Sequence, residues 1–400
     1  MKKPVRNFDD MPLCEPSLRI LHVLRAPVGG LFRHVLDLAQ EQAARGHAVG
    51  LIADSRTGGE TADRRLARIA PLLRLGVVRL PMRRKPHASD LPAIARVCRE
   101  IARLKPDVVH GHGSKGGLYA RASGFVPGLG DPLRVYTPHG GSFHQQPGRA
   151  LYMAVERVVA SQTDLLLFES EFIAREYAKG VGPTRALRRI ARNGLLPNEF
   201  APVAAAPEGA EFLYVGELSA YKGVDTLIEA LAALHRSGAA KARLAIVGSG
   251  CELARLAAIV EHYDLNRHVA FHGALPARDA FALGRIVVAP SRAESLPYIV
   301  MEAIAADKTV IATDVGGVAE IFGPLRDRLI PRDDPAALAR AMAAALRRDP
   351  ADAAAERAAL SRQVATHFSV KVMADSALAA YAQGLSRKGR APAALSEAAI

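Results

Sequence analysis

Short, continuous apolar runs alternate with longer amphipathic segments along most of this chain. Runs that are apolar throughout, each followed by a loop and a helical pattern, are typical of strands buried on both faces of a parallel sheet. In the first half we predict such strands at 19–24, 48–54, 77–80, 107–110, 134–137 and 164–168, and a helix from Leu31 to a stop at Gly46. This alternation indicates an α/β fold.

The same rhythm returns in the second half, after a Pro- and Ala-rich segment at 201–210 that is typical of a linker. There we predict strand and loop units at 211–216, 243–250, 268–276 and 309–320. Since 400 residues are many for one core, we predict two domains, 1–200 and 211–370. Helices are predicted at 335–347 and 351–363, with a last helix at 371–386. The basic, then Ala-rich tail at 387–400 is expected to be disordered.

One stretch, residues 290–302, carries two carboxylates with seven residues between them, Glu294 and Glu302. Pro297 and Ser295 are helix-start signals, so Glu294 is predicted in a loop and Glu302 inside an apolar helix. A buried carboxylate needs a partner. Spacing alone leaves two interpretations open: a salt-bridged core glutamate, or a carboxylate that accepts hydrogen bonds from ligand hydroxyls beside a phosphate-attracting helix N-terminus.

The stretch PSRAESLPYIVMEA (290–303), followed by VIATDVGGVAEI (310–321), resembles the signature of glycosyltransferase family 4. These are retaining nucleotide-sugar enzymes of the GT-B fold. The resemblance implies two Rossmann-like, doubly wound domains with a cleft between them and a C-terminal helix that crosses back to the first domain. It also favours the ligand-binding interpretation of the two glutamates.

In the second domain the resemblance implies the site of an NDP-sugar donor. Glu302 would hold the ribose, Glu294 the sugar hydroxyls and Lys222 the diphosphate. Glu217 stands where the family usually has an arginine, which removes one cation from the diphosphate site; Arg292 is a candidate replacement. The remaining predicted donor-binding residues are Gly29, Gly30, Gly216, Gly248, Gly250, Gly273, Ser295 and Leu296.

In the first domain, the loop 26–30 joins a strand to a helix without the GxGxxG pattern of dinucleotide binders, so a dehydrogenase is not supported. The glycine pair 29–30 could also serve only the turn. By resemblance, His139 lies at the reaction centre, and with Glu294 and Lys222 it forms the predicted catalytic set. Candidate acceptor contacts are His112, Lys115 and His144.

His110 and His112 are two residues apart, which places both on one face of a strand, so a metal pair is conceivable. No third ligand has convincing spacing, and we predict no metal site. Cationic side chains and a helix N-terminus would replace a metal at the diphosphate, so no cofactor is expected beyond the NDP-sugar co-substrate.

A net charge of +13 calls for an anionic partner or surface. No nucleic-acid-reading motif or stacking platform is found, so nucleic acid is not expected. Basic residues crowd the first half, which suits peripheral contact with an anionic membrane; the alternative is arginine on solvated faces. No run approaches about 20 apolar residues, and the three cysteines indicate a reducing compartment. We expect a cytoplasmic protein, associated with the inner face of the cytoplasmic membrane.

The predicted function is therefore transfer of a sugar, with retention, from an NDP-sugar to a saccharide or polyprenyl-linked acceptor in exopolysaccharide or lipopolysaccharide biosynthesis. Two alternatives stay open. A nucleotide-sugar epimerase of the same architecture would act on one substrate without an acceptor. A transferase-derived scaffold without activity is motivated by Glu217.

Overall fold

The computed structural model describes residues 17–140, 149–238 and 241–390. The first half of this described chain forms a seven-stranded parallel sheet with the order β3-β2-β1-β4-β5-β6-β7. Its strands are β1 (Arg19–Leu24), β2 (Ala48–Asp54), β3 (Gly76–Leu80), β4 (Val108–His112), β5 (Leu133–Thr137), β6 (Leu165–Phe168) and β7 (Leu187–Ile190). Its helices are α1 (Gly29–Ala44), α2 (Gly59–Ile69), α3 (Asp90–Leu104), α4 (Gly113–Ala122), α5 (Arg149–Ala160) and α6 (Glu171–Val181), with 3-10 turns η2 (Ala70–Leu72), η3 (Ser123–Phe125) and η4 (Pro197–Phe200).

The second half forms a five-stranded parallel sheet, within the described residues, with the order β10-β9-β8-β11-β12. Its strands are β8 (Ala210–Val215), β9 (Leu244–Val247), β10 (Val269–Phe271), β11 (Gly284–Ala289) and β12 (Thr309–Ala312). Its helices are α7 (Val224–Arg236), α8 (Leu253–His262), α9 (Ala277–Ala280), α10 (Tyr298–Ala305), α11 (Val318–Phe322), α12 (Pro335–Arg347) and α13 (Pro350–His367), with η5 (Ala220–Lys222), η6 (Phe281–Leu283) and η7 (Gly323–Arg328).

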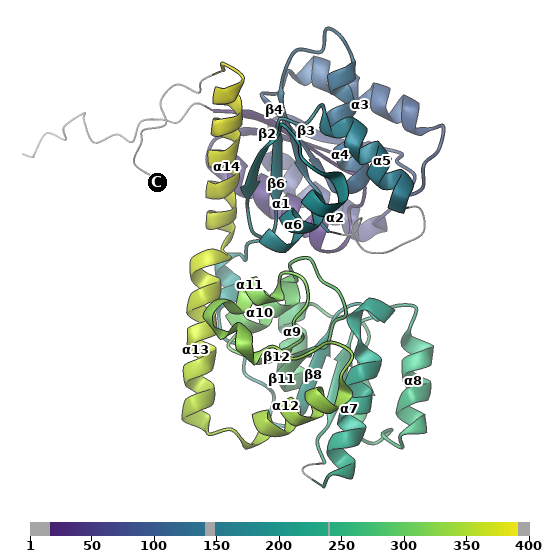
Figure 1. The fold of residues 1–400 in the computed structure, drawn as a ribbon, viewed down its shortest axis with the longest axis vertical. Helices are drawn as coiled ribbons and strands as arrows, with labels where there is room; N and C mark the ends of the chain where they lie inside the picture. The colour runs from purple at the N-terminus through teal and green to yellow at the C-terminus, as the bar shows by residue number, and fades with distance from the viewer. Residues whose placement is uncertain (1–16, 141–148, 239–240, 391–400) are drawn as a thin grey trace, which may run out of the picture.

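Both sheets are doubly wound: the strand order reverses between β1 and β4 in the first and between β8 and β11 in the second. Open α/β sheets bind ligands outside the carboxyl ends of the strands at such reversals. In the first sheet the reversal pairs His22 with His110 in register and brings His112 to the end of β4. Loops at the carboxyl ends of both sheets meet between the two halves of the molecule (Figure 1).

The two halves are joined by two chain crossings that run side by side. The amide of Leu195 donates to the carbonyl of Phe368 at 2.8 Å, and the amide of Val370 donates back to the carbonyl of Leu195 at 2.9 Å. After this second crossing the last helix, α14 (Val370–Arg387), packs on the first half, where Met373, Ala377 and Tyr381 join the core beneath β5 and β6. Figure 1 shows α13 and α14 stacked along one side of the molecule, one on each half.

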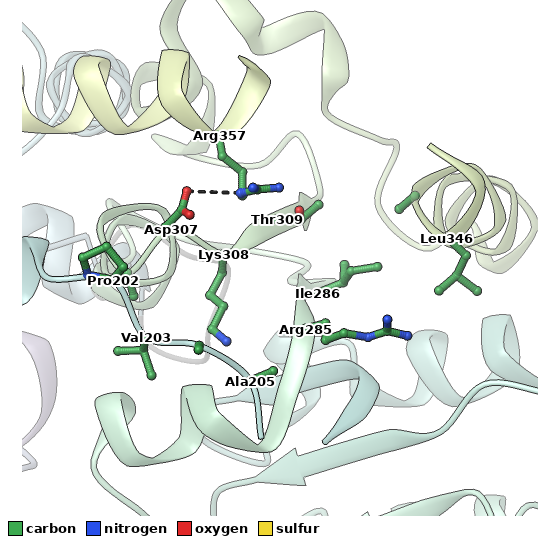
Figure 2. Close-up of a pocket in the computed structure, with 13 residues that line it drawn as sticks. Pro202, Val203, Ala205, Arg285, Ile286, Asp307, Lys308, Thr309, Leu346 and Arg357 are labelled. Carbon is green, nitrogen blue, oxygen red and sulfur yellow. Dashed lines mark hydrogen bonds and ion pairs between the residues drawn. The ribbon is translucent and has the colours of Figure 1, made fainter. Parts of the chain in front are cut away.

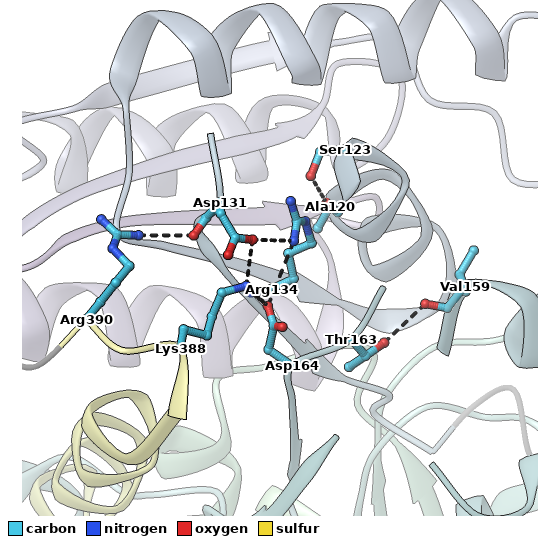
Figure 3. A network of polar contacts seen from close by, with 9 residues as sticks. All are labelled: Ala120, Ser123, Asp131, Arg134, Val159, Thr163, Asp164, Lys388 and Arg390. Carbon is cyan, nitrogen blue, oxygen red and sulfur yellow. Dashed lines mark hydrogen bonds and ion pairs between the residues drawn. The ribbon is translucent and has the colours of Figure 1, made fainter. Parts of the chain in front are cut away.

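Ion pairs fasten the end of α14 to the first sheet (Figure 3). Lys388 Nζ lies 2.6 Å from Asp131 and 3.1 Å from Asp164, and Arg390 contacts Asp107 at 3.2 Å. The segment 387–400 was predicted to be disordered, but Lys388 and Arg390 are held by these ion pairs. Residues 391–400 lie outside the described residues.

The predicted α/β, two-sheet fold is confirmed, and the predicted strands appear with shifts of one or two residues at their ends. The first helix starts at Gly29 rather than Leu31, because the glycine pair forms its first turn instead of a separate loop. Strands β7 and β11 had no counterpart among the predictions. The β7 sequence, LRRI, carries two arginines at the sheet edge and lacks a continuous apolar run.

Candidate active site

Lys222 and Glu294 form the charged centre of the second half. Lys222 ends η5, after β8, and Glu294 lies in the loop after the neighbouring strand β11. Lys222 Nζ lies 2.6 Å from Glu294 Oε1, and the Ser291 hydroxyl donates to the same oxygen at 2.7 Å. Both side chains of the ion pair keep some exposure. The structure therefore brings together the two residues predicted for the diphosphate and the donor sugar.

The turn after β12 holds Glu294 in place. Gly316 has a φ of +59°, and a Cβ there would lie 1.8 Å from the carbonyl oxygen of Glu294. A Cβ at Gly317 would lie 2.4 Å from the carbonyl oxygen of Ser295, which accepts the Gly317 amide at 2.9 Å. Only glycine fits these approaches, so the VGG segment positions the loop that carries Glu294 and Ser295.

Glu302, on α10, pairs across the interface with Arg33 of α1. Arg33 also contacts Glu199 at 2.6 Å and Asp37 at 3.3 Å, and its guanidinium lies 4.1 Å from the ring centroid of Tyr298. One cation thus serves three carboxylates. Burial raises the pKa of Glu302, which Arg33 partly offsets, and burial raises the pKa of Asp37 to about 6. The partner that a buried Glu302 requires is an arginine of the other half.

Ser295 and Leu296 touch the first half through their backbones. The Ser170 hydroxyl donates to the Ser295 carbonyl at 3.4 Å, and Asn193 Nδ2 donates to the Leu296 carbonyl at 3.0 Å. A Cβ at Gly140 would lie 2.5 Å from the Ser295 Cβ. The residues next to His139 and Glu294 are therefore in contact.

The predicted donor-site glycines lie where chain segments approach closely. A Cβ at Gly248 would lie 1.8 Å from the Gly216 carbonyl oxygen, and one at Gly250 would lie 2.2 Å from the Leu218 carbonyl oxygen. Gly273 accepts the Gly248 amide at 2.7 Å. At the start of α1, Gly29 has a φ of +64°, and a Cβ at Gly30 would touch the Tyr298 ring at 3.4 Å. Backbone packing alone accounts for Gly248 and Gly250, whereas a Cβ at Gly216 would lie 2.8 Å from the Tyr214 hydroxyl.

Arg292, the predicted replacement cation, is engaged within the second half. Its guanidinium lies 2.9 Å from Asp225 and 2.5 Å from Asp333, and it donates to the Ala220 carbonyl at 2.7 Å. Glu217 is exposed. A diphosphate role for Arg292 would require it to leave two carboxylates and stays a prediction.

His139 follows β5 with a φ of +51° and belongs to a cluster of histidines. Its Nδ1 lies 2.9 Å from Oε2 of the buried Glu169, and its Nε2 lies 3.2 Å from His112 Nδ1. The His34 ring meets it edge-on, with 4.8 Å between centroids. The two predicted site histidines, 112 and 139, thus lie together.

Beneath this pair the cluster continues into the sheet. His112 Nε2 lies 2.9 Å from His22 Nδ1, and His22 Nε2 lies 2.8 Å from Gln42 Oε1. His110 contacts the hydroxyls of Tyr381 and Thr137. Burial lowers the pKa of His22 to about 4 and holds the pKa values of His34, His110 and His112 well below the ordinary range. These four imidazoles are neutral near pH 7.

The other acceptor candidates lie elsewhere or outside the described chain. Lys115 Nζ contacts both oxygens of Asp90, at 2.6 and 2.8 Å, and the carbonyl of Lys85, so it belongs to a separate network. His144 lies outside the described residues.

Sequence reasoning missed Arg33, His34 and Glu169. An arginine close behind a glycine pair at a helix start is a signal that could have indicated Arg33. Glu169 directly follows β6, where chemistry was expected, but it carries no motif.

A cavity of about 490 Å³ lies at the opposite, amino ends of β11 and β12 (Figure 2). The segment 202–205, Arg285, Lys308 and Arg357 help to line it. Lys308 Nζ donates to the Gly284 carbonyl at 3.0 Å. Because sheets of this type bind substrates at the carboxyl edge, the interface between the halves remains the candidate active site.

Comparisons with known proteins agree with this geometry. The model "Glycosyl transferases group 1" matches residues 197–362, and the model "Glycosyltransferase Family 4" matches residues 28–194. A glycogen synthase of Mycobacterium tuberculosis is 29% identical over 368 residues, which are 84% of this chain and 86% of that protein. A GDP-mannose-dependent alpha-mannosyltransferase of the same species is 28% identical over 331 residues, 76% of this chain and 80% of the relative.

Among solved structures, a sucrose-phosphate synthase of Thermosynechococcus elongatus superimposes with a TM-score of 0.75 at 21% identity, covering 92% of this chain and all of that one. HepE of Anabaena, in complex with UDP and glucose, gives 0.74 at 18% identity, covering 93% of this chain and all of HepE. The fold is thus that of a GT-B glycosyltransferase. The two models together span most of the described chain, which belongs to the group 1 glycosyltransferases of family 4 and is a glycosyltransferase.

Proposed function

We propose that this enzyme transfers a sugar, with retention, from an NDP-sugar to a saccharide or lipid-linked acceptor during assembly of a cell-surface polysaccharide. The observation that carries the proposal is the Lys222–Glu294 pair at the reversal of the second sheet, beside the His139 loop of the first. A diphosphate would replace Glu294 as the partner of Lys222. Glu294 would then be released to accept hydrogen bonds from the donor sugar.

The names of relatives support the choice of pathway and donor. Two of them, TuaC of Bacillus subtilis and WcaL of Escherichia coli, are provisionally named as glycosyltransferases of teichuronic acid and colanic acid biosynthesis. HepE is described with UDP-glucose. These names favour an NDP-hexose donor and a polysaccharide product.

In this proposal transfer needs no metal. Lys222 and the N-terminus of α10 supply positive charge at the diphosphate. Treatment with EDTA should leave the rate unchanged, and restoration of a lost rate by Mg²⁺ would contradict a metal-free mechanism.

The acceptor is proposed to lie at the inner face of the cytoplasmic membrane. No helix in the described part of the chain is long and apolar enough to cross a membrane. Helix α5 exposes Leu151, Val155 and Val158 at helical spacing, and η3 beside its end exposes Phe125. Helix α3, which packs against η3, carries exposed Arg96, Arg99 and Arg103. An apolar stripe beside basic residues suits an anionic membrane surface.

The test of the function is transfer of radiolabel from UDP-, GDP- or ADP-sugars to membranes of the producing cell, with NMR of the product to assign the anomer. Incorporation with a retained anomer is expected. Donor epimerisation without any acceptor would instead establish the epimerase.

The membrane contact is tested by co-sedimentation with vesicles. Val158→Asp should reduce binding to phosphatidylglycerol vesicles by about fivefold or more, since burying one charge opposes insertion. Leu253→Asp, an exposed position of the second half, is the matched control and should bind like the unaltered chain. Equal binding by both variants would remove α5 from the contact.

A further inference from the structure

Three imidazoles from three elements converge at the interface. His34 comes from α1, His112 ends β4 and His139 follows β5. One ring nitrogen of each lies within 4.8 Å of the other two, and His112 Nδ1 lies 3.2 Å from His139 Nε2. Sequence spacing concealed this set, because His34 and His139 approach His112 only through the fold.

The outer hydrogen bonds of these rings fix where their protons lie. Asn193 uses Nδ2 to donate to the Leu296 carbonyl, so its Oδ1 faces His34 Nδ1 at 2.9 Å and accepts a hydrogen bond from the protonated Nδ1. His34 Nε2 is then an unprotonated nitrogen, and it is buried without a hydrogen-bond partner among the described residues.

The same reasoning applies to the other two rings. The carboxylate of Glu169 accepts a hydrogen bond from His139 Nδ1, so His139 Nε2 carries a free lone pair. Gln42 Oε1 accepts a hydrogen bond from His22 Nε2, so the proton of the His22 ring is on Nε2 and His22 Nδ1 is an acceptor. His112 Nε2 then donates to His22 Nδ1, and His112 Nδ1 carries a free lone pair. Two lone pairs, on His112 Nδ1 and His139 Nε2, are thus 3.2 Å apart, where they repel unless a cation lies between them. The His34 ring, which has a ring nitrogen within 4.8 Å of both, carries a third lone pair in the same cluster.

We propose that His34, His112 and His139 form a binding site for a divalent transition metal of the Zn²⁺ type. Three neutral imidazoles with a fourth position open are a common zinc set, and Zn–N bonds of about 2.0 Å place ligand nitrogens about 3.3 Å apart. The His112–His139 pair already has this spacing. The partners Asn193, Glu169 and His22 supply the outer hydrogen bonds that metal-bound histidines have.

The second histidine set, His22, His110 and His112, lacks this property. His110 uses one ring nitrogen on Tyr381 and the other on Thr137, and both nitrogens of His22 are engaged by His112 and Gln42. The metal therefore belongs at the set that faces the interface.

A metal at this site would take the Nε2 lone pair of His139 away from the donor sugar. Zn²⁺ should then inhibit transfer, and EDTA should reverse the inhibition; this consequence rests on the proposed function. Metal binding itself does not depend on that function and is measured separately.

The experiment uses the untagged full chain, stripped with EDTA and dialysed, and titrated with ZnCl₂ by calorimetry and with Co²⁺ by absorption. One Zn²⁺ per chain and the visible absorption of tetrahedral Co²⁺ are expected. His34→Gln should abolish this binding, and Glu169→Gln, which keeps the side-chain shape, should weaken it about 10- to 100-fold. His262→Gln, at an exposed histidine of the second half, is the control and should bind like the unaltered chain.

Circular dichroism and thermal melts establish that each variant is folded. If the unaltered chain binds no Zn²⁺, or if His34→Gln and Glu169→Gln both bind it as tightly as the unaltered chain, the site is wrong. Failure of the sugar-transfer assay with normal metal binding would instead overturn only the proposed function.

Discussion

The two sides of the interface neutralise their polar groups in different ways. On the second half, Lys222, Ser291 and Glu294 form a charged, partly exposed group whose members can exchange partners with a charged ligand. On the first half, four histidines are buried and neutral, and hydrogen bonds hold the cluster together and to Gln42, Asn193 and Glu169; the four are His22, His34, His110 and His112. The difference assigns charge recognition to one side and a fixed hydrogen-bonded framework to the other.

Acidification should remove this difference between the two sides and have the largest effect, because protonating the buried histidines lowers the free energy of unfolding. The pKa of His22 is about 4 in the folded chain against 6.5 unfolded. The contribution of the neutral His22 ring to the free energy of unfolding is therefore fully present above pH 6.5 and is lost as the pH falls toward 4. His22 alone should cost about 2 kcal/mol between pH 6.5 and 5, and His34, His110 and His112 act in the same direction. Urea unfolding at pH 7.5, 6.5 and 5 measures the loss.

Two carboxyls oppose this trend. Burial raises the pKa of Asp37 to about 6 and also raises the pKa of Glu302, so protonating either carboxyl favours the folded state as the pH falls. Two carboxyls against four histidines leave a net loss of stability on acidification. A free energy of unfolding that is unchanged down to pH 5 would contradict buried neutral histidines.

Removing Arg33, where the two sides meet, is expected to have the next largest effect. Arg33→Ala leaves Glu302, Glu199 and Asp37 without their shared cation and should lower the free energy of unfolding by about 3 kcal/mol. The control is Arg64→Ala, which breaks an exposed pair with Glu60 and should cost about 0.5 kcal/mol or less. Equal melting temperatures for the two variants would show that the cross-interface pair contributes little.

Lys222→Ala tests the role of the charged group on the second half in turnover. A fixed cation that stabilises the leaving diphosphate should be worth about 100-fold in turnover, or about 2.7 kcal/mol, while donor binding changes less. Steady-state kinetics measure kcat and KM separately. Lys241→Ala, at an exposed lysine of the same half, should leave both constants unchanged. An unaltered kcat in Lys222→Ala would remove this residue from the mechanism.

Glu302→Gln decides between the two interpretations of this carboxylate. If Glu302 holds the ribose, donor affinity should fall about tenfold, or about 1.4 kcal/mol, with the fold retained. Calorimetric titration with the nucleotide measures it, and a thermal melt reports the loss of the Arg33 pair. A lowered melting temperature with unaltered affinity would assign Glu302 to structure alone.

The second half's face of the interface could be predicted from the sequence, because Glu294, Glu302 and the glycine turn at 316–317 all lie within residues 290–320. Their spacing along the chain indicated the site. Local patterns also indicated most strands of both sheets, since buried parallel strands are continuous apolar runs. The family resemblance assigned Lys222 and Glu294 to one donor site, but the pairing of β8 with β11 that brings them together was not predicted.

The histidine framework could not be predicted in the same way. His22, His34, His112 and His139 lie on different elements, and only the reversal of the first sheet and the packing of α1 on it bring them together. The Arg33–Glu302 pair likewise depends on how the two halves dock. A single sequence holds no local signal for such contacts, because their partners are distant in the chain and belong to different predicted units.

The central claim, a donor nucleotide site at the interface, is tested most directly by thermal-shift measurements of the full chain with UDP, GDP, ADP and their common sugars, with and without EDTA. A selective rise in melting temperature with one nucleotide, undiminished by EDTA, is the predicted result. No shift with any of these ligands at millimolar concentration would contradict the donor site and favour a transferase-derived scaffold.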